Sequence, residues 1–482
     1  MATHKYIFIP PGPVLDEFYR DRSPVSIITG PLGSAKTTTT CYKILALIRE
    51  QAPNKKKVRP TRSIAIRNTF GELLSTTAKD FCTIFDDLGV FKAGSKEPPS
   101  FTMRFRLEDG TVCFHEMLFI ALDRPQHVKK LRGHQVTFFW LSETKELPKE
   151  IIDMADLRHG RFPSMQLGEV LPSYSGMIGD TNQCDEDHWL YEFQEKQKPS
   201  GMLPDWQFFV QPGGVIKRGG QWVLNSQAEN LPNLPQGYYD KRIQGKKEDW
   251  IKVNLGNQYG FVSDGKPVHP EYEDSVHCCD NRDPLPDETI VLGFDFGRTP
   301  ACAILQKQGQ TWYVLDDYCA INMSAAKFAP NLLVYLNQNY KGHTFIGWGD
   351  PAGANAGEQV EHSAIEILNQ NGIPCMPCDS QDPLLRRAAI SQPLTELGMS
   401  GRPRLMVCKK AEMVRKGLAG KFCYRRLQVA GDEKYMDVPD KNAWSHPVEA
   451  VEYGLLGEGE GLDALIDAND ANDYTERPAS PY

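Results

Sequence analysis

The chain has 482 residues, a length that suggests two or three domains. Its hydrophobic content of 40%, charged content of 24% and formal net charge of −8 are ordinary for a globular protein and do not indicate nucleic-acid binding. No apolar run reaches the roughly 20 residues that span a bilayer, the first residues lack a signal-peptide pattern, and the 12 scattered cysteines favour reduced thiols over a disulfide framework. A cytosolic protein with no membrane partner is therefore expected.

The first predicted element is a strand that runs into a Gly-rich turn over residues 27–37, with the sequence I-I-T-G-P-L-G-S-A-K-T, followed by a helix from Thr38 to Arg49. This is the layout of a phosphate-binding loop, in which backbone N–H groups and a helix N-terminus face an anion. Lys36 would reach the β- and γ-phosphates, and Thr37 would hold Mg²⁺. The alternative is a Gly-rich turn that opens an ordinary helix, because Ala35 stands where the pattern has its second Gly. The residues expected to bind the nucleotide here are Gly30, Pro31, Leu32, Gly33, Ser34, Ala35, Lys36, Thr37 and Thr38.

A second apolar strand, Val136 to Leu141, ends in Ser142 and Glu143. A P-loop enzyme needs an acid at such a strand end, and Glu143 can act as the general base on water. Ser142 takes the place of the usual Asp and could hold Mg²⁺ only weakly, directly or through a water. The alternative is a buried strand followed by a loop carboxylate.

Further strand-like runs at 63–67, 117–122 and 177–180 alternate with helix-like segments up to about residue 225. Such alternation predicts an α/β domain over 1–225, with a parallel sheet covered by helices. Residues 226–287 are rich in Pro, Gly, Asn and charged residues, which predicts a linker.

A third pattern begins at residue 290 and predicts a ribonuclease H-like domain over 288–456. Strands are expected at 290–295, 301–306 and 311–317, then a helix at 324–338 and a strand at 344–349. Asp295 lies near the end of the first strand and Asp350 follows the last. Carboxylates at neighbouring strand ends bind two divalent metals in this fold, although each acid taken alone is more simply a turn acid.

The site needs another acid, and the best candidate is Glu449, in the segment that opens a C-terminal helix. Asp440 and Glu452 are alternatives. Beyond them, residues 457–482 are rich in acids and poor in large apolar side chains, which predicts a disordered tail.

In this joint order, the motifs resemble the large terminase subunit of tailed bacteriophages over nearly the whole chain. Besides the P-loop, the resemblance lies in Ala65–Thr69, Ala121–Pro125 with Lys130–Gly133, Asp180–Gln183 with Asp187–Trp189, Gly293–Gly297, and Ser445–Tyr453. The chain departs from the family at Ala35, at Ser142 and at Glu449, where the family usually has Asp.

The resemblance implies an N-terminal P-loop ATPase and a C-terminal ribonuclease H-like endonuclease. Lys36 and Thr37 would bind phosphate and Mg²⁺, Glu143 would activate water, and Thr181 with Asn182 would sense the γ-phosphate. Arg132 is the candidate arginine finger that acts on a neighbour's ATP, with Arg67 as its competitor. Asp295, Asp350 and Glu449 would hold Mg²⁺, or alternatively Mn²⁺, in the nuclease.

The function implied is a viral DNA-packaging motor that hydrolyses ATP to translocate double-stranded DNA into a procapsid and cleaves it. Its partners would be the portal protein, on which the acidic tail would dock, and a small terminase subunit. It would form a homo-oligomeric ring, expected to be a pentamer, in the host cytoplasm and transiently on the portal vertex, and be absent from the mature virion. The alternatives are a P-loop helicase or translocase with a non-catalytic C-terminal domain, and a non-catalytic scaffold of the capsid vertex.

Overall fold

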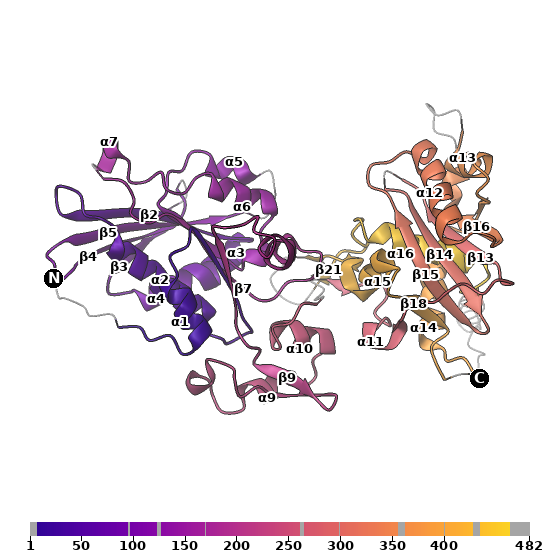
Figure 1. Cartoon of the computed structure of the whole chain (residues 1–482), viewed down its shortest axis with the longest axis horizontal. Coiled ribbons are helices and arrows are strands. Elements are labelled where there is room, and N and C mark those ends of the chain that lie inside the picture. The colour runs from indigo at the N-terminus through magenta and orange to yellow at the C-terminus, as the bar shows by residue number, and fades with distance from the viewer. Residues whose placement is uncertain are drawn as a thin grey trace, which may run out of the picture. The chain divides into compact units, whose positions relative to one another are not determined.

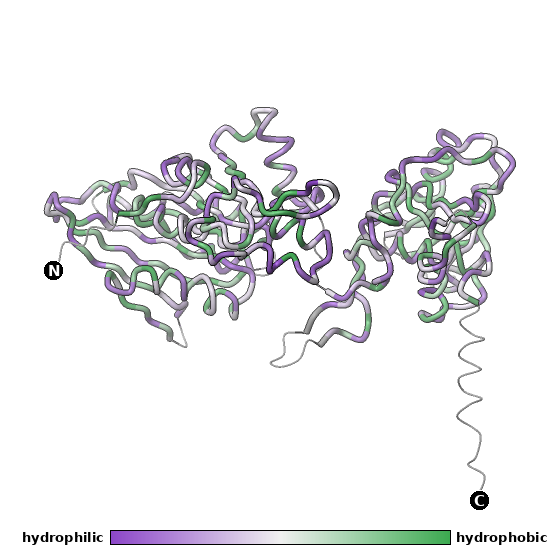
Figure 2. The backbone as a smooth tube through the Cα atoms, turned by 90° about the horizontal axis from the view of Figure 1, so that it is seen from below, coloured by the Kyte–Doolittle hydropathy of each residue, from purple (hydrophilic) through white to green (hydrophobic). Residues whose placement is uncertain are grey.

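The computed structural model describes residues 7–94, 97–122, 127–168, 170–260, 265–297, 299–354, 362–399, 401–427 and 434–462. The chain divides into two compact units, Met1–Phe261 and Val262–Tyr482, which carry the indigo-to-magenta and the orange-to-yellow ribbons of Figure 1. Hydrophobic and hydrophilic stretches alternate along the backbone of both units (Figure 2). Among the described residues, no helix combines the length and apolar character needed to cross a membrane.

The first unit is built on an eight-stranded sheet of order β3-β4-β5-β2-β6-β7-β1-β8. Its strands are β1 (Val25–Thr29), β2 (Val58–Arg67), β3 (Gly89–Lys92), β4 (Ser100–Arg106), β5 (Val112–Ala121), β6 (Phe138–Ser142), β7 (Gly176–Thr181) and β8 (Trp206–Val210). The six strands from β5 to β8 in this order are parallel, while β4 and β3 add an antiparallel edge. The predicted parallel sheet is confirmed, and β7 lies between the P-loop strand β1 and β6.

Helices cover both faces of this sheet because successive strand residues point to opposite sides. Ile28, Phe138 and Trp140 face one core, and Ile27 and Phe139 face the other. The helices of this unit are α1 (Pro13–Arg20), α2 (Lys36–Glu50), α3 (Phe70–Glu72), α4 (Lys79–Ile84), α5 (Val128–Leu131), α6 (Lys149–Asp156), α7 (Met165–Gly168), α8 (Trp189–Tyr191), α9 (Tyr238–Ile243) and α10 (Glu248–Asn254). Helices α1, α2 and α4 pack on the first core, and α5, α6 and α8 on the second.

The segment after β8 belongs to the first unit up to residue 261. It contains the hairpin β9 (Val215–Arg218) and β10 (Gln221–Leu224), and then α9 and α10, which share a small core with Val215. The composition predicted a linker from 226, but apolar side chains such as Tyr239 and Ile251 are buried there and hold the segment in place. The boundary between the units therefore lies at residue 261.

The second unit holds a seven-stranded sheet of order β12-β18-β15-β14-β13-β16-β17. Its strands are β12 (Cys278–Cys279), β13 (Ile290–Asp295), β14 (Ala301–Gln308), β15 (Thr311–Cys319), β16 (Phe345–Gly349), β17 (Met376–Pro377) and β18 (Leu405–Cys408). Strands β13, β14 and β15 are antiparallel neighbours, and β16 pairs parallel with β13. This is the strand order predicted for a ribonuclease H-like fold, and it is confirmed.

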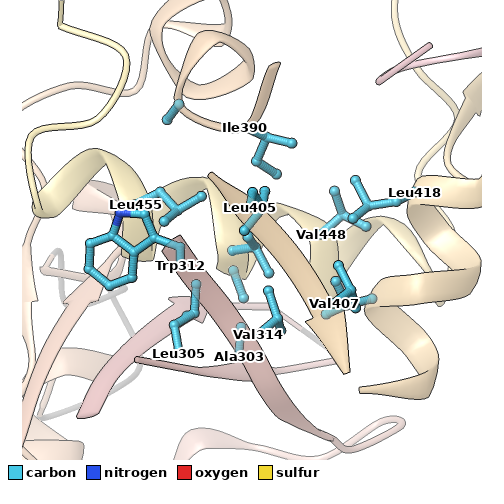
Figure 3. Close-up of a cluster of buried hydrophobic side chains, with 14 of the residues drawn as sticks. Ala303, Leu305, Trp312, Val314, Ile390, Leu405, Val407, Leu418, Val448 and Leu455 are labelled. Carbon is cyan, nitrogen blue, oxygen red and sulfur yellow. The ribbon is translucent and has the colours of Figure 1, made fainter. Parts of the chain in front are cut away.

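Two cores enclose this sheet. The helices of the second unit are α11 (Asp274–His277), α12 (Ala325–Asn339), α13 (Ala364–Gln370), α14 (Pro383–Thr395), α15 (Glu412–Lys416) and α16 (Ser445–Gly457). Figure 3 shows the face on which α14 and α16 pack: Ile390, Val448 and Leu455 lie over Leu305 and Val314. On the other face α12 and α13 cover the alternate strand residues, among them Leu292 and Phe294.

The first residues of the predicted acidic tail pack on the second unit. Trp348 Nε1 donates to Glu458 Oε1 at 2.8 Å, and Trp312 Nε1 donates to Glu460 Oε1 at 2.8 Å. Arg404 Nη2 donates to Glu460 as well, at 2.8 Å. Glu458 and Glu460 are thus anchored, whereas residues 463–482, where most of the predicted tail lies, fall outside the described residues.

Candidate nucleotide and metal sites

The P-loop connects β1 to α2 and has the backbone of a phosphate-binding turn. Gly33 and Ala35 both take positive φ, at 76° and 65°. Ala35 therefore occupies a left-handed position that favours glycine, which explains why the pattern has Gly there. At Gly30, a Cβ would lie 2.0 Å from Gln211 Oε1, so only glycine fits without movement of that side chain.

Lys36 begins α2 and is buried. Its Nζ donates to Asn182 Oδ1 at 2.6 Å and to Pro31 O at 3.3 Å. Burial lowers the pKa of Lys36, and the negative charges of Glu143 and Asp180 oppose that shift. The neighbouring Ser34 Oγ is buried and has no hydrogen-bond partner among the described residues. A buried cation, an orphan hydroxyl and the free N–H groups of a first helical turn fit a bound phosphate.

Glu143 lies directly after β6 and meets the predicted γ-phosphate sensor. Its Oε2 accepts from Thr181 Oγ1 at 3.5 Å and from the Asn182 backbone N–H at 3.4 Å. The Glu143 backbone is left-handed, with φ 50° and ψ 59°, a strained conformation of the kind found at functional sites. The structure thus brings together Lys36, Glu143, Thr181 and Asn182, which come from three separate segments.

Ser142 and Thr37 contact different partners. The Ser142 hydroxyl is buried and lies 2.9 Å from Thr77 Oγ1. Thr37 Oγ1 instead donates to Asp180 Oδ2 at 2.7 Å, and Trp140 Nε1 donates to Asp180 Oδ1 at 2.7 Å. Burial raises the pKa of Asp180, and the nearby charge of Glu143 adds to that rise. Sequence reasoning did not place Asp180 in the site, although its position near the end of a strand was a usable signal.

The two candidate arginines differ in exposure. Arg132 is exposed at the end of α5, where it could reach a neighbouring molecule. The Arg67 side chain is only 14% exposed, and its guanidinium lies 3.6 Å from Glu72 and 3.9 Å from Glu146 in its own unit. Burial, followed by the charge of Glu143, raises the pKa of Glu146 to about 7. Arg67 therefore belongs to the electrostatic surroundings of Glu143 in the same chain.

The segment predicted as a linker, together with Gln211, holds the backbone of the P-loop. Tyr239 Oη donates to Leu32 O at 3.0 Å, and Asn230 Nδ2 donates to Gly33 O at 2.7 Å. Gln211 Nε2, just after β8, donates to Ser34 O at 3.2 Å. Three consecutive P-loop carbonyls are held in this way, which fixes the course of the loop backbone.

The second candidate site lies where β13 and β16 end. Asp295 is the last residue of β13, and Asp350 follows β16, with its backbone N–H donating to Phe294 O at 3.2 Å. Because the two strands are parallel neighbours, their carboxyl ends meet at one sheet edge. Burial raises the pKa of Asp295, while the hydrogen bond and charge of His446 oppose that rise. The predicted meeting of the two strand ends is thus present.

Helix α16 brings two more ligands to Asp295. It crosses β13 so closely that a Cβ on Gly293 would lie 1.9 Å from Ala450 O. His446 Nδ1 lies 2.6 Å from Asp295 Oδ2, and one ligand atom from each of Asp295, His446 and Glu449 lies within 4.8 Å of the others. These donors suit a divalent cation. The sequence reasoning missed His446 as a ligand, although its spacing three residues before Glu449 puts both on one helix face.

The other proposed carboxylates have different partners. Asp350 lies outside this three-residue cluster, and its Oδ1 accepts from Gln381 Nε2 at 2.9 Å. Glu452 pairs with His269 at 3.1 Å and with Arg386 at 3.4 Å, while Asp440 pairs with Arg425 at 2.8 Å. Glu449 is itself paired with Lys441 and, at 3.5 Å, with Arg386. Among the three alternatives for the last acid, Glu449 is the one beside Asp295.

Comparison with known proteins found similarity to solved structures only. No protein-family model matches the chain, and no curated protein matches it. The large terminase of a thermophilic bacteriophage is 12% identical, with 91% of this chain and 96% of that chain covered and a TM-score of 0.39. The large terminase of bacteriophage HK97 is 12% identical, with coverages of 90% and 91% and a TM-score of 0.36.

A third structure is the large terminase nuclease of the thermophilic phage G20c with bound cobalt. It is 14% identical and has a TM-score of 0.27, and the match covers 39% of this chain and 96% of that one. All three of these structures come from large terminases of bacteriophages.

Proposed function

We propose that this chain is the ATPase and nuclease of a viral DNA-packaging motor. The observation that carries the proposal is the pair of sites in one chain. One gathers Lys36 and Glu143 beside a phosphate-binding turn, and the other gathers Asp295 and Glu449 at the edge of a ribonuclease H-like sheet. A translocating ATPase joined to a DNA-cleaving domain accounts for both.

In the first unit, the residues fit hydrolysis of ATP. Lys36 would contact the β- and γ-phosphates, and the hydroxyl of Thr37 would hold Mg²⁺, which neutralises charge on the phosphates. Glu143 would accept a proton from the attacking water. Because Thr181 and the Asn182 N–H both donate to Glu143, loss of the γ-phosphate beside Glu143 would alter these two hydrogen bonds and so displace the end of β7.

Arg132 is the residue we propose to act on a neighbour's ATP. Its exposure on α5 suits a contact between molecules, and an arginine supplied in trans stabilises the charge of the transferring phosphoryl group. The arrangement requires a homo-oligomeric ring, which we propose to be a pentamer. Arg67, whose side chain is mostly buried beside Glu146, would act within its own chain.

In the second unit, the residues fit metal-dependent cleavage of double-stranded DNA. Asp295, His446 and Glu449 would hold one divalent cation, and Asp350 at the adjacent strand end would contribute to a second. Two such ions polarise the phosphodiester and stabilise its attacking and leaving oxygens. The two carboxylates in the set suit Mg²⁺ and Mn²⁺, and the imidazole favours the transition metal Mn²⁺.

The remaining partners rest on the resemblance alone. A motor of this kind acts at the portal of a procapsid in the host cytoplasm, receives DNA selected by a small terminase subunit, and leaves before the virion matures. The acidic tail beyond residue 462 would dock on the portal. This docking segment lies outside the described residues.

The test uses one variant in each site of the full-length protein. Glu143→Gln is expected to bind ATP but to hydrolyse it about 10²- to 10⁴-fold more slowly, because the amide cannot accept the proton. Asp295→Asn is expected to abolish plasmid cleavage with Mg²⁺ or Mn²⁺ while retaining ATP hydrolysis. The matched controls are Glu150→Gln and Asp287→Asn, which alter exposed acids of the same units.

Each failure has a distinct meaning. Normal ATP hydrolysis by Glu143→Gln would show that the base is assigned wrongly. Absence of metal-dependent cleavage by the wild-type chain would favour a translocase with a non-catalytic second unit. Absence of ATP turnover in the wild type would leave a structural role at the capsid vertex.

A further inference from the structure

Strand β6, which in a P-loop enzyme supplies the carboxylate that holds Mg²⁺, has no acid at its last residue, Ser142. Strand β6 ends in Ser142 followed by Glu143, and Glu143 is engaged with Thr181 and Asn182. The Ser142 hydroxyl bonds to Thr77 Oγ1 at 2.9 Å and is buried. A P-loop site that holds Mg²⁺ through Thr37 normally has a carboxylate behind that hydroxyl. At Ser142 this charge is missing.

The neighbouring strand β7 carries a carboxylate, Asp180, next to Ser142. Asp180 on β7 pairs in register with Ser142 on β6 and with Ile28 on β1. Residues in register on adjacent strands point to the same face of the sheet. Asp180 therefore lies beside Ser142 on that face and carries the carboxylate that Ser142 lacks. It is 1% exposed.

The contacts of Asp180 fix both of its oxygens. Oδ2 accepts the Thr37 hydroxyl proton at 2.7 Å, and Oδ1 accepts from Trp140 Nε1 at 2.7 Å. When Thr37 donates its proton to a carboxylate, the lone pairs of its oxygen remain available to a cation. The indole holds the carboxylate in that orientation. One contact comes from α2, which the P-loop opens, and the other from β6, the strand beside β7.

We propose that Asp180 supplies the buried carboxylate of the magnesium site in place of the acid missing at Ser142. This inference rests on the proposed ATPase function and deepens it. Asp180 acts as a positioning residue: it orients Thr37 and adds a negative charge beside the cation. Substrate contacts remain with Lys36 and the P-loop backbone.

The test measures the binding of a fluorescent ATP analogue to the full-length protein, with Mg²⁺ titrated and with EDTA. Asp180→Asn keeps the shape of the side chain and removes its charge. It is expected to weaken the Mg²⁺-dependent affinity about 10- to 100-fold, the usual loss when an outer partner of a metal site is removed. Affinity in EDTA is expected to stay within twofold of wild type.

Two further variants sharpen the result. Ser142→Ala is the matched control at the same strand register, and it is expected to leave Mg²⁺-dependent affinity within twofold of wild type. The exchange variant Ser142→Asp/Asp180→Asn moves the buried carboxylate to the register-paired position on the adjacent strand and is expected to recover Mg²⁺-dependent affinity to within about fivefold. The exchange variant also carries the test if Asp180→Asn alone does not fold.

Several outcomes overturn the proposal. Unchanged Mg²⁺ dependence in folded Asp180→Asn would do so, as would a loss in Ser142→Ala as large as that in Asp180→Asn, or no recovery in the exchange variant. In each of these cases the wild type still binds and hydrolyses ATP, so the proposed ATPase stands. Failure of the wild type to bind the nucleotide under any condition would instead refute the ATPase itself.

Discussion

Replacing Ala35 with glycine is expected to stabilise the first unit. Ala35 has φ 65° and ψ 13°, and a residue with a Cβ in this region costs roughly 1–2 kcal/mol. Glycine gives back roughly 0.5–1 kcal/mol, because it loses more backbone entropy on folding. The net gain in the free energy of unfolding is about 0.5–1 kcal/mol, or about 1–4 °C in the melting temperature of a unit of this size.

The assay is urea denaturation of the full-length wild type and variant, followed by circular dichroism. The matched control is Ala46→Gly, which lies inside the same helix α2 and is expected to lose about 1 kcal/mol, the ordinary cost of glycine in a helix interior. The two substitutions are chemically identical and have opposite predicted signs. If Ala35→Gly loses as much stability as Ala46→Gly, the left-handed strain at the P-loop is not real.

Two further predictions concern α16 and a buried histidine. Gly293→Ala is expected to lower the free energy of unfolding by about 1–3 kcal/mol and to abolish metal-dependent cleavage, because its Cβ would press on Ala450 O and push the helix from Asp295. The control Gly297→Ala, whose Cβ would meet nothing within 4 Å, should change neither stability nor cleavage. Equal effects of the two variants in cleavage and unfolding assays would refute this reasoning. His115 is buried and its pKa is lowered to about 3 by burial. Since the unfolded chain takes up the proton first, stability should fall below about pH 6.5, by about 2 kcal/mol at pH 5. Urea midpoints measured between pH 7 and pH 5 should lose this slope in His115→Gln, and an unchanged slope would contradict the assignment.

Local signals in the sequence accounted for much of the fold. The P-loop was predictable because a strand, a Gly-rich turn and a Lys-Thr pair are consecutive, and the structure places β1 and α2 on either side of it. The strands of the second unit were predictable from apolar runs separated by short turns. Even so, the antiparallel edge made by β3 and β4 was not anticipated.

What the sequence could not supply was contact between distant segments. The composition around residues 226–260 is typical of a linker, since it is rich in Pro, Gly and Asn. Asn230 and Tyr239 nevertheless donate hydrogen bonds to P-loop carbonyls that lie 197 and 207 positions away in the chain. Only the folded sheet brings these groups together. The role of His446 was missed for the related reason that its partner, Asp295, lies 151 positions earlier.

The contact between Thr37 and Asp180 follows from topology rather than from a motif. A metal site needs a negative charge at one point in space, and any strand that ends at that edge of a parallel sheet can provide it. Because β7 lies between β1 and β6, Asp180 pairs directly with the P-loop strand β1, whereas Ser142 is one strand further away. An acid missing from one strand end is therefore weak grounds for calling a P-loop inactive. The neighbouring strand ends have to be inspected first.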